Sequence, residues 1–539
     1  MIAMVRNVSL KWVTHQDCCC ATFTEPIMPA KTDSALLFGT PQHMGPVEMK
    51  TFFNRRTFIK QTGALTTGLS CSLNGVGVHA SESPAISKSD FASLRKHLRG
   101  QLIQQGDPDY DVVSRVFYWN PAIASKPVAV VRCEHEQDVV RGVDFARSHD
   151  LEVAVRSGGH SYSAMGSCDG LVIDVSPLKR IDVDPKNRVV RAQAGALSGE
   201  VARVAGGYGL APVLGQCRGV SAIGVTLGGG LSWLSGLYGA CCDNLVSATL
   251  VTAEGKTLDV DDESDPELLW GLRGAGANFG VATSFEAKVH EIGSVLAGEV
   301  HFAVKDAKAV LRGFREIMHE SPDCFQATLN LTSGERGLFV SMCHTGAERD
   351  ADQMLKKIRA IAPPIREAVG RQSFAALAER APATDSGKGP SPAFRGIQTV
   401  YRDRFTDEII DVYVEQLLGG TPDVVMGLSH YMHGQVCRVD PTATAFPHRR
   451  EHSIHLRASF SWSDPLLTES KLAWGEQWRD ALRDESNERI YANYQTYETA
   501  AGSPSVFAQN HARLLALKQK HDPTNFFHRN ANIAAGRSL

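Results

Sequence analysis

Two glycine-rich turns, about sixty residues apart, constrain this chain more than any other feature. The first is RSGGHSY at 156–162, which directly follows an apolar, strand-like segment at 151–155. The second is the turn at 215–219, which places Cys217 among glycines. Glycine lets main-chain N–H groups approach a phosphate closely, because no Cβ intervenes and positive φ is allowed. With His160 on one turn and Cys217 on the other, the pattern predicts a nucleotide cofactor held covalently at two points.

Five stretches of sequence carry a family resemblance, because short motifs that match by chance rarely keep their order. The chain resembles the berberine bridge enzyme-like flavoproteins of the wider vanillyl-alcohol oxidase superfamily, which has PCMH-type FAD-binding domains. The resemblance implies FAD attached through its 8α position to His160 and through its 6 position to the sulfur of Cys217. The stretches are RSGGHSY at 156–162, GQCRGVSAIGVTLGGGLSWLSGLYGACCDNL at 215–245, LLWGLRGAGANFGVATSFE at 268–286, DPTATAFPHRR at 440–450, and NYQTYE with KQKHDPTNFF near the C-terminus.

The resemblance implies an α+β fold, with a two-part PCMH-type FAD-binding domain and a substrate domain whose antiparallel sheet is covered by helices. We expect a non-native or disordered extension at 1–48, a twin-arginine signal peptide at 49–80, the FAD-binding domain at 81–296, the substrate-binding domain at 297–480, and a C-terminal segment at 481–539 that returns to the FAD domain.

Hydrophobic periodicity agrees with a change of architecture near residue 296. Between 127 and 295, short apolar strands alternate with helical patterns, as in α/β layers. The clearest helix is 136–148. Beyond 297, strand patterns dominate and a helix at 405–418 would cover one face of their sheet. We expect the strands of this second sheet at 300–304, 327–331, 337–342, 424–431, 435–439 and 453–462.

Composition excludes some partners. The chain has 539 residues, 43% of them apolar, which is enough for a large core. Its net charge of -3 gives no basic footprint for nucleic acid. No apolar run is long enough to span a bilayer. The cysteines form no CxxC pair or His-spaced cluster, so we expect no metal site.

The N-terminal region has the three parts of an export signal. Asn54-Arg55-Arg56-Thr57-Phe58-Ile59-Lys60 has the twin-arginine form, a weakly apolar stretch follows at 62–78, and small residues end it at Ala80. Twin-arginine export moves folded proteins, which suits a cofactor that is attached before export. We therefore expect the Tat export machinery as a partner, and a periplasmic or secreted protein that starts at Met49.

The cofactor-binding prediction covers both turns and the segments that resemble the family. Val220, three residues after Cys217, is valine in the oxygen-reactive members of the family, whereas dehydrogenases have a bulkier leucine. The resemblance thus implies that Val220 leaves space for dioxygen beside the flavin; a plain core valine is the alternative. The glycines at 228–230 would let the main chain approach the flavin or would serve packing. The predicted cofactor-binding residues are Arg156, Ser157, Gly158, Gly159, His160, Ser161, Cys217, Val220, Gly224, Gly228, Gly229, Gly230, Gly280, Val281 and Asn493.

Four residues are predicted to act on the substrate: Tyr494, Arg457, Tyr162 and His455. Tyr494 occupies the position of a tyrosine near the substrate in sugar-oxidising relatives. A phenol titrates near 10, so it needs a cationic neighbour to act as a base. Strand alternation places His455, Arg457 and Ser459 on one face.

Two positions depart from the family pattern. Arg457 stands where relatives carry Glu or Gln, so it would depress the pKa of Tyr494 or hold an anionic substrate group; a salt-bridged arginine is the alternative. Leu231 stands where many relatives carry an aromatic residue. Both departures argue against a sugar, because sugars favour aromatic platforms and dense hydrogen bonding.

The sequence therefore predicts an exported FAD-linked oxidase that removes hydride from a carbinol or activated C–H of a small molecule, with O2 as acceptor and H2O2 as product. The alternatives are an FAD-linked dehydrogenase or an oxidative cyclase of an aromatic metabolite. A flavin-binding protein without turnover is an alternative of another class, suggested by the missing acidic base. The sequence does not specify the substrate, the oligomeric state or any disulfide.

Overall fold

A computed structural model describes residues 86–332, 337–380, 394–418, 423–484, 489–496 and 504–534. The predicted extension at 1–48 and the predicted signal peptide at 49–80 lie outside these residues. Mixed helices and antiparallel sheets make up the described part, as expected for an α+β fold. None of its helices combines the length and the hydrophobicity needed to cross a bilayer.

The first sheet carries the RSGGHSY turn at the end of one of its strands. Its order is β1-β2-β4-β3, in which β2, β4 and β3 are parallel and β1 is antiparallel to β2. Helix α4 (Glu136–Ser148) connects β2 to β3 and buries Val139, Val143 and Ala146, spaced as one helix face. The strands are β1 (Gln101–Gln104), β2 (Ala129–Arg132), β3 (Val153–Arg156) and β4 (Leu171–Asp174).

A second sheet supports the Cys217 turn. Its order is β5-β6-β10-β8-β9, all antiparallel, and β7 pairs with the far end of β10. Helices α5 (Ser198–Gly206) and α6 (Ala222–Leu227) flank the turn, and α8 (Pro266–Ala275) precedes β10. The strands are β5 (Ile181–Asp184), β6 (Val189–Gln193), β7 (Leu210–Pro212), β8 (Leu245–Val251), β9 (Thr257–Val260) and β10 (Val281–Glu291).

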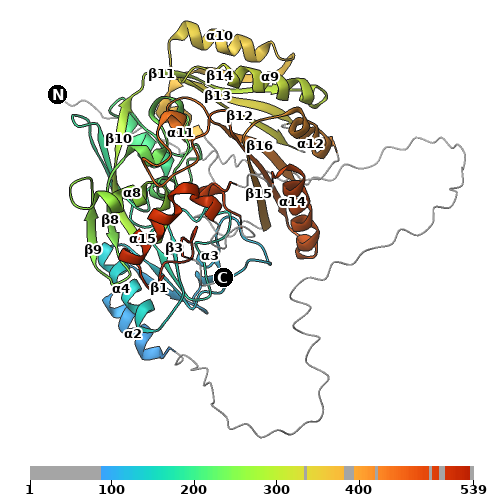
Figure 1. The fold of residues 1–539 in the computed structure, drawn as a ribbon. Coiled ribbons are helices and arrows are strands. Elements are labelled where there is room, and N and C mark those ends of the chain that lie inside the picture. Colours follow the sequence, from blue (N-terminus) through green and yellow to red (C-terminus); the bar gives the residue numbers. More distant parts are fainter. Residues whose placement is uncertain are drawn as a thin grey trace, which may run out of the picture. The chain divides into compact units, whose positions relative to one another are not determined.

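The third sheet is antiparallel and has seven strands in the order β14-β11-β13-β12-β16-β17-β15. Helices α9 (Ala307–His319), α10 (Glu348–Arg359), α12 (Asp407–Leu418) and α14 (Thr468–Leu482) lie along one side of it (Figure 1). One core joins these helices to the sheet, so the opposite face of β16 and β17 is left for other contacts. The strands are β11 (Ser294–Phe302), β12 (Phe325–Thr332), β13 (Leu338–His344), β14 (Pro364–Ser373), β15 (Phe394–Arg402), β16 (Val424–Tyr431) and β17 (Ile454–Trp462).

The C-terminal segment packs against the FAD-binding part. Helix α15 (His511–His521) contacts α8, and Leu514 and Leu517 join the core of the first two sheets. The buried ammonium of Lys518 donates to Asp522 at 2.7 Å and to the carbonyl of Asn278 at 2.7 Å. The side chain of Asn278 in turn donates to Ala531 O at 3.0 Å. The C-terminal segment is therefore bonded to both the main chain and the side chain of Asn278.

Most predicted elements of the third sheet are confirmed, with one error. The segment at 424–431 is β16, and 453–462 contains β17. The predicted strand at 435–439 is wrong, because Gln435–Arg438 forms the short helix α13. Gly434 precedes it with φ +74°, a left-handed conformation that ends any extended run. Strands β14 and β15 were not among the predicted strands.

Candidate active site

The two glycine-rich turns meet back to back. A Cβ on Gly158 would lie 2.7 Å from the backbone nitrogen of Ser221, so only glycine allows this approach. Ser157 and Ser221 both donate their hydroxyl hydrogens to the carbonyl of Ala194, at 2.6 and 3.3 Å. The fold therefore brings the turn at 156–162 and the turn at 215–219 to one place.

The first turn has the free donors that a pyrophosphate needs. Within the described part of the chain, the backbone N–H groups of Gly158, Gly159 and Ser161 donate to no acceptor. Gly159 has φ +67°, which suits consecutive N–H groups converging on an anion. The hydroxyl of Ser161 instead accepts from Met165 N at 3.3 Å. The backbone of this turn, rather than its side chains, thus fits the phosphates of FAD.

His160 and Cys217 are both partly exposed. The His160 ring stacks on Phe117, with centroids 4.7 Å apart. The turn that holds Cys217 closes through a hydrogen bond from Val220 N to Cys217 O at 3.3 Å, and Val220 is itself partly exposed. Both side chains are therefore accessible for bonds to a flavin, and Val220 lies one turn beyond the thiol.

Arg156 was predicted to bind the cofactor, but the protein already occupies its guanidinium. It forms a buried ion pair with Asp174 at 3.0 Å and donates to the carbonyl of Arg115 at 3.3 Å. A buried guanidinium with a carboxylate and a carbonyl as partners is a structural group. Arg156 thus joins β3 to β4, and its part in cofactor binding stays a prediction.

Packing explains the other glycines of the cofactor prediction. A Cβ on Gly228 would lie 2.1 Å from Asn493 Oδ1, and Gly229 and Gly230 face Phe446 and Cys241 in the same way. Gly224 lies in α6, where its N–H donates to the hydroxyl of Ser221. Gly280 packs on the carbonyl of Val251, and Val281 is fully buried in the core.

Asn493 links the C-terminal segment to helix α6, which follows the Cys217 turn. Its amide donates to Val225 O at 2.8 Å and to the hydroxyl of Tyr491 at 2.9 Å. Leu231 is buried in the same cluster as Tyr491 and Phe446. These contacts fix the position of the segment that carries Tyr494.

The predicted alternation of β17 is confirmed. Leu456 and Ala458 enter the core beneath the helices, whereas Arg457 and Ser459 are partly exposed on the opposite face. His455 lies on this face too, where its ring contacts those of Tyr494 and Tyr491 at 5.6 and 5.2 Å between centroids. Burial, together with neighbouring His430 and His448, holds the pKa of His455 well below its ordinary value. His455 thus lines the site as an uncharged side chain.

Tyr494 has a partner that the sequence did not reveal. Its hydroxyl lies 2.7 Å from Nε2 of His430 on β16. The Tyr494 ring also stacks on Tyr162, with centroids 5.3 Å apart, and Tyr162 meets Tyr118 edge to face at 4.8 Å. We call Tyr118, Tyr162, His430, Arg457 and Tyr494 the Tyr494 cluster.

The cluster lies beside Cys217. The thiol is close enough to Tyr494, Tyr162 and Arg457 to interact with each electrostatically. Tyr162, Cys217, His430, Arg457 and Tyr494 all retain partial exposure, so these side chains border solvent-accessible space. A flavin attached to Cys217 would therefore be held next to the Tyr494 cluster.

Burial controls protonation in the cluster. It raises the pKa of Tyr494 above its ordinary value, with a further rise from Tyr162; Arg457 and Ser429 oppose the rise without overcoming it. The expectation that Arg457 makes Tyr494 an easily ionised base is therefore wrong in net direction. Burial, and then Arg457, lower the pKa of His430 to about 3. At neutral pH the pair is a protonated phenol beside a neutral imidazole.

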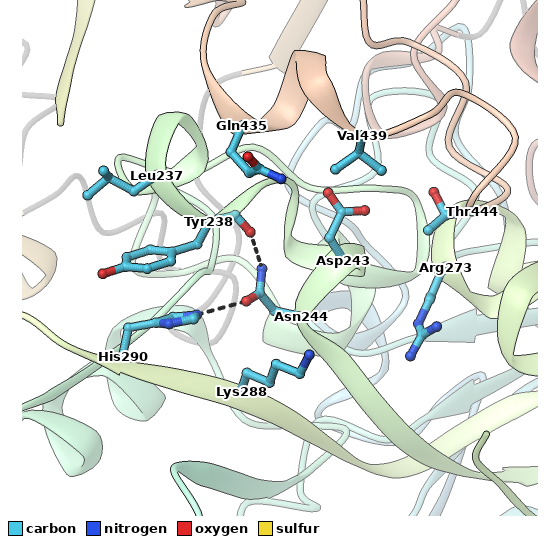
Figure 2. A pocket seen from close by; sticks show the side chains of 10 residues that line it. All are labelled: Leu237, Tyr238, Asp243, Asn244, Arg273, Lys288, His290, Gln435, Val439 and Thr444. Atoms are coloured by element: carbon cyan, nitrogen blue, oxygen red, sulfur yellow. Dashed lines mark hydrogen bonds between the residues drawn. The ribbon is translucent and has the colours of Figure 1, made fainter. Parts of the chain in front are cut away.

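A concave region lies away from the Tyr494 cluster and is lined by ten residues (Figure 2). We call it the His290 pocket; its volume is about 420 Å³. His290 lies flat on Tyr238, with centroids 3.7 Å apart, and its Nε2 is 2.8 Å from Oδ1 of Asn244 (Figure 2). Lys288 and Arg273 add positive charge to its lining. None of the predicted site residues lines this pocket.

Comparison with known proteins gives matches for both turns and for the C-terminal segment. Residues 127–261 match a family model described as FAD binding domain, and residues 490–534 match one described as Berberine and berberine like. The chain is 27% identical to (R)-6-hydroxynicotine oxidase from Paenarthrobacter nicotinovorans over 460 residues, which is 81% of this chain and 97% of that protein.

Solved structures agree in fold. The structure of 6-hydroxy-D-nicotine oxidase from Arthrobacter nicotinovorans has a TM-score of 0.72 at 25% identity, covering 81% of this chain and 98% of that one. Glucooligosaccharide oxidase from Acremonium strictum, described with a 6-S-cysteinyl, 8α-N1-histidyl FAD, has a TM-score of 0.71 at 19% identity. That match covers 83% of this chain and 100% of the other, and it shows a shared fold.

Proposed function

We propose that this chain, which belongs to the berberine bridge enzyme-like FAD-linked oxidoreductases, oxidises a carbinol or similarly activated C–H of a small molecule. One observation carries the proposal. The phenol of Tyr494 lies beside Cys217 and is hydrogen-bonded to a neutral imidazole, which gives a proton somewhere to go. Proton removal by a positioned group is what hydride transfer from an alcohol requires.

FAD would be held by the backbone of the turn at 156–162 and bonded to His160 and Cys217. The free N–H groups of Gly158, Gly159 and Ser161 and the accessible side chains of His160 and Cys217 support this arrangement. A protein of the same fold is described with FAD joined to both a cysteine and a histidine. When bound, FAD supplies the acceptor for the hydride.

Tyr494 and His430 would move the proton. The phenol oxygen of Tyr494 accepts the proton of the substrate hydroxyl while its own proton passes to Nε2 of His430, 2.7 Å away. The substrate thereby loses one proton and one hydride and becomes a carbonyl compound. Because the raised pKa of Tyr494 disfavours a free phenolate, the transfer to His430 must accompany the transfer from the substrate.

Dioxygen is the proposed final acceptor, with hydrogen peroxide as the product. Val220 supports this, since it follows Cys217 by one turn and is smaller than the leucine of the family's dehydrogenases. Replacing it in Val220→Leu should slow reoxidation of the reduced protein by air and leave anaerobic reduction unchanged. Equal reoxidation rates in both proteins would show that Val220 does not control the access of dioxygen.

Export through the twin-arginine pathway to the periplasm or the cell exterior is proposed from residues 54–60 alone. The full-length chain carrying Arg55→Lys and Arg56→Lys should stay in the cytoplasm, whereas the unchanged chain should reach the periplasm in a shortened form. Equal distribution of the two proteins would contradict the export proposal without touching the catalytic one.

The function is tested by mixing the purified protein with a library of alcohols, amines and phenols under nitrogen. At least one class should bleach the flavin absorbance, and air should restore it with formation of hydrogen peroxide. Bleaching that air does not reverse would favour a dehydrogenase. Failure of every compound to bleach the flavin would favour a binding protein without turnover.

A further inference from the structure

Arg457 is a largely buried, partly exposed cation that has no acidic partner among the described residues. Its guanidinium donates to Asn330 Oδ1 at 3.2 Å, and within the described part of the chain its Nε has no acceptor and no carboxylate pairs with it. Burial of an unpaired charge is costly, so buried cations are normally paired. The charge of Arg457 therefore calls for an anion that the protein itself does not supply.

The three fully buried Arg and Lys side chains of the described chain are each paired with a carboxylate. Arg156 faces Asp174 at 3.0 Å, Arg449 faces Asp243 at 2.6 Å, and Lys518 faces Asp522 at 2.7 Å. Each pair is almost fully shielded from solvent. The contrast separates Arg457 from the cations that stabilise the fold.

The sheet holds the Arg457 guanidinium in one orientation. Asn330, Gly427 and Arg457 are register neighbours across β12, β16 and β17. Gly427 provides the space for this contact, because a Cβ at this position would lie 3.3 Å from Nε of Arg457 and 3.2 Å from Oδ1 of Asn330. Asn330 thus anchors one end of the guanidinium and Tyr162 lies within hydrogen-bonding reach of it, while Nε is free of any acceptor in the described part of the chain.

The groups around the free edge are uncharged donors. Tyr162, Tyr494 and Tyr118 are the nearest titratable groups, and burial raises the pKa of all three, so they stay neutral. The buried hydroxyls of Ser429 and Ser459 lie beside the phenols of Tyr494 and Tyr118, respectively, and can donate to an anion as well. An anion with two oxygens could accept from the guanidinium edge and from a hydroxyl together.

We propose that Arg457 binds a carboxylate of the substrate, so that the oxidised molecule is a hydroxy acid or a related compound with a carboxylate near the reacting carbon. This inference rests on the proposed function, because it places the substrate between Cys217 and Tyr494. A planar two-oxygen anion matches the guanidinium edge, whereas a neutral amide of the same shape leaves the charge uncompensated.

The test is equilibrium binding of two matched pairs, acetate with acetamide and benzoate with benzamide, to the full-length flavin-loaded protein. Binding is followed by the change in flavin absorbance and, independently, by intrinsic fluorescence. At least one carboxylate should bind at least about 30-fold more tightly than its amide, and Arg457→Gln should abolish that preference. Arg457→Lys should retain part of it.

Lys288→Gln is the matched control, because Lys288 is an exposed cation of the His290 pocket. It should leave the preference for the carboxylates unchanged. Equal binding of acids and amides, or a preference that survives in Arg457→Gln, would overturn the inference.

Neither readout requires hydride transfer. Arg457-dependent carboxylate binding without bleaching by any compound would therefore uphold the carboxylate site and reject the proposed function. Bleaching by neutral alcohols with no carboxylate preference would uphold the proposed function and reject the carboxylate site.

Discussion

His430 with Tyr494 and His290 with Tyr238 bring the same two side-chain types together in two parts of the molecule. In the Tyr494 cluster the contact is a hydrogen bond between Nε2 of His430 and the phenol oxygen at 2.7 Å. In the His290 pocket the two rings are stacked 3.7 Å apart, and the imidazole bonds to the amide of Asn244 instead (Figure 2). The first geometry can pass a proton from the phenol to the imidazole, and the second cannot.

The cations near the two pairs differ as well. Lys288 in the His290 pocket is exposed, so water and salt screen its charge. Arg457 is only partly exposed and has no acidic partner among the described residues, and its charge contributes to the low pKa of His430. The comparison teaches that the same residue types become chemically useful when burial, a hydrogen bond and an uncompensated charge act on one another.

The largest expected difference between the two regions comes from removing each phenol oxygen. Tyr494→Phe should slow anaerobic flavin reduction by about 10²- to 10⁴-fold, because the substrate proton loses its acceptor. Tyr238→Phe should leave the rate unchanged. Stopped-flow absorbance measures both. If the Tyr494→Phe protein reduces its flavin at the original rate, Tyr494 is not the proton acceptor and the two regions do not differ in this respect.

His430→Asn should slow flavin reduction by about 10- to 100-fold, a smaller loss because water can take the proton instead. The unchanged protein should show a rate that is flat from about pH 5 to about pH 9, since His430 is neutral above a pKa of about 3 and the pKa of Tyr494 is raised. In the variant the rate should rise with pH. His290→Asn, the control, should keep the flat profile; a flat profile in His430→Asn would assign His430 a packing role.

Arginine replacements should change stability in opposite directions. Arg156→Gln leaves Asp174 buried without its partner and should cost about 3–5 kcal/mol of unfolding free energy. Arg457→Gln removes an unpaired charge and should leave the melting temperature of the ligand-free protein unchanged or higher. Differential scanning calorimetry compares them. Equal destabilisation by both would mean that Arg457 is paired in solution.

The smallest effect concerns acid stability. Burial lowers the pKa of His430 to about 3 and that of His290 to about 4, below the 6.5 of the unfolded chain. The unfolded chain therefore binds more protons below about pH 6.5, so the stability present above that pH is lost progressively as the pH falls toward these folded-state values. Urea midpoints should fall less steeply in His430→Asn and His290→Asn. Below about pH 4 the slope of the midpoint against pH should still differ from that of the parent only in the His430 variant, because the contribution of His290 is then constant.

The sequence predicted the turns well because their chemistry is local. Glycines, a histidine and a cysteine next to one another specify a close backbone approach wherever the strands lie. Helix 136–148 was predicted with its observed bounds for the same reason, since its apolar spacing is complete within the segment. The ion pair of Arg156 was not predicted, because its partner, Asp174, lies on a neighbouring strand that the sequence pattern does not place.

His430 was missed because of a β-bulge. In β16 the core-facing residues are Val424, Met426 and Leu428, so strict alternation would send His430 into the core as well. The register shifts between Leu428 and His430, with Ser429 as the extra residue, and Tyr431 takes the next core position. The bulge turns His430 toward Tyr494, and alternation from a single sequence cannot locate such a bulge.

The pKa of Tyr494 was misjudged for a related reason. The sequence identified Arg457 as a cation on the right face of β17, and the structure confirms that it opposes the rise in the pKa of Tyr494. It could not weigh that attraction against burial, which depends on Tyr162, Tyr491 and His455 closing around the phenol. Electrostatic balance is a property of the packed site.

The most direct test of the central claim is the intact mass of the purified, fully denatured protein, read together with the colour of the acid precipitate. We expect a yellow precipitate and a mass increased by one FAD. Either His160→Ala or Cys217→Ala should keep the added mass, and the double variant should lose it. A colourless precipitate and the mass of the bare polypeptide in the unmodified protein would contradict covalent attachment at both residues.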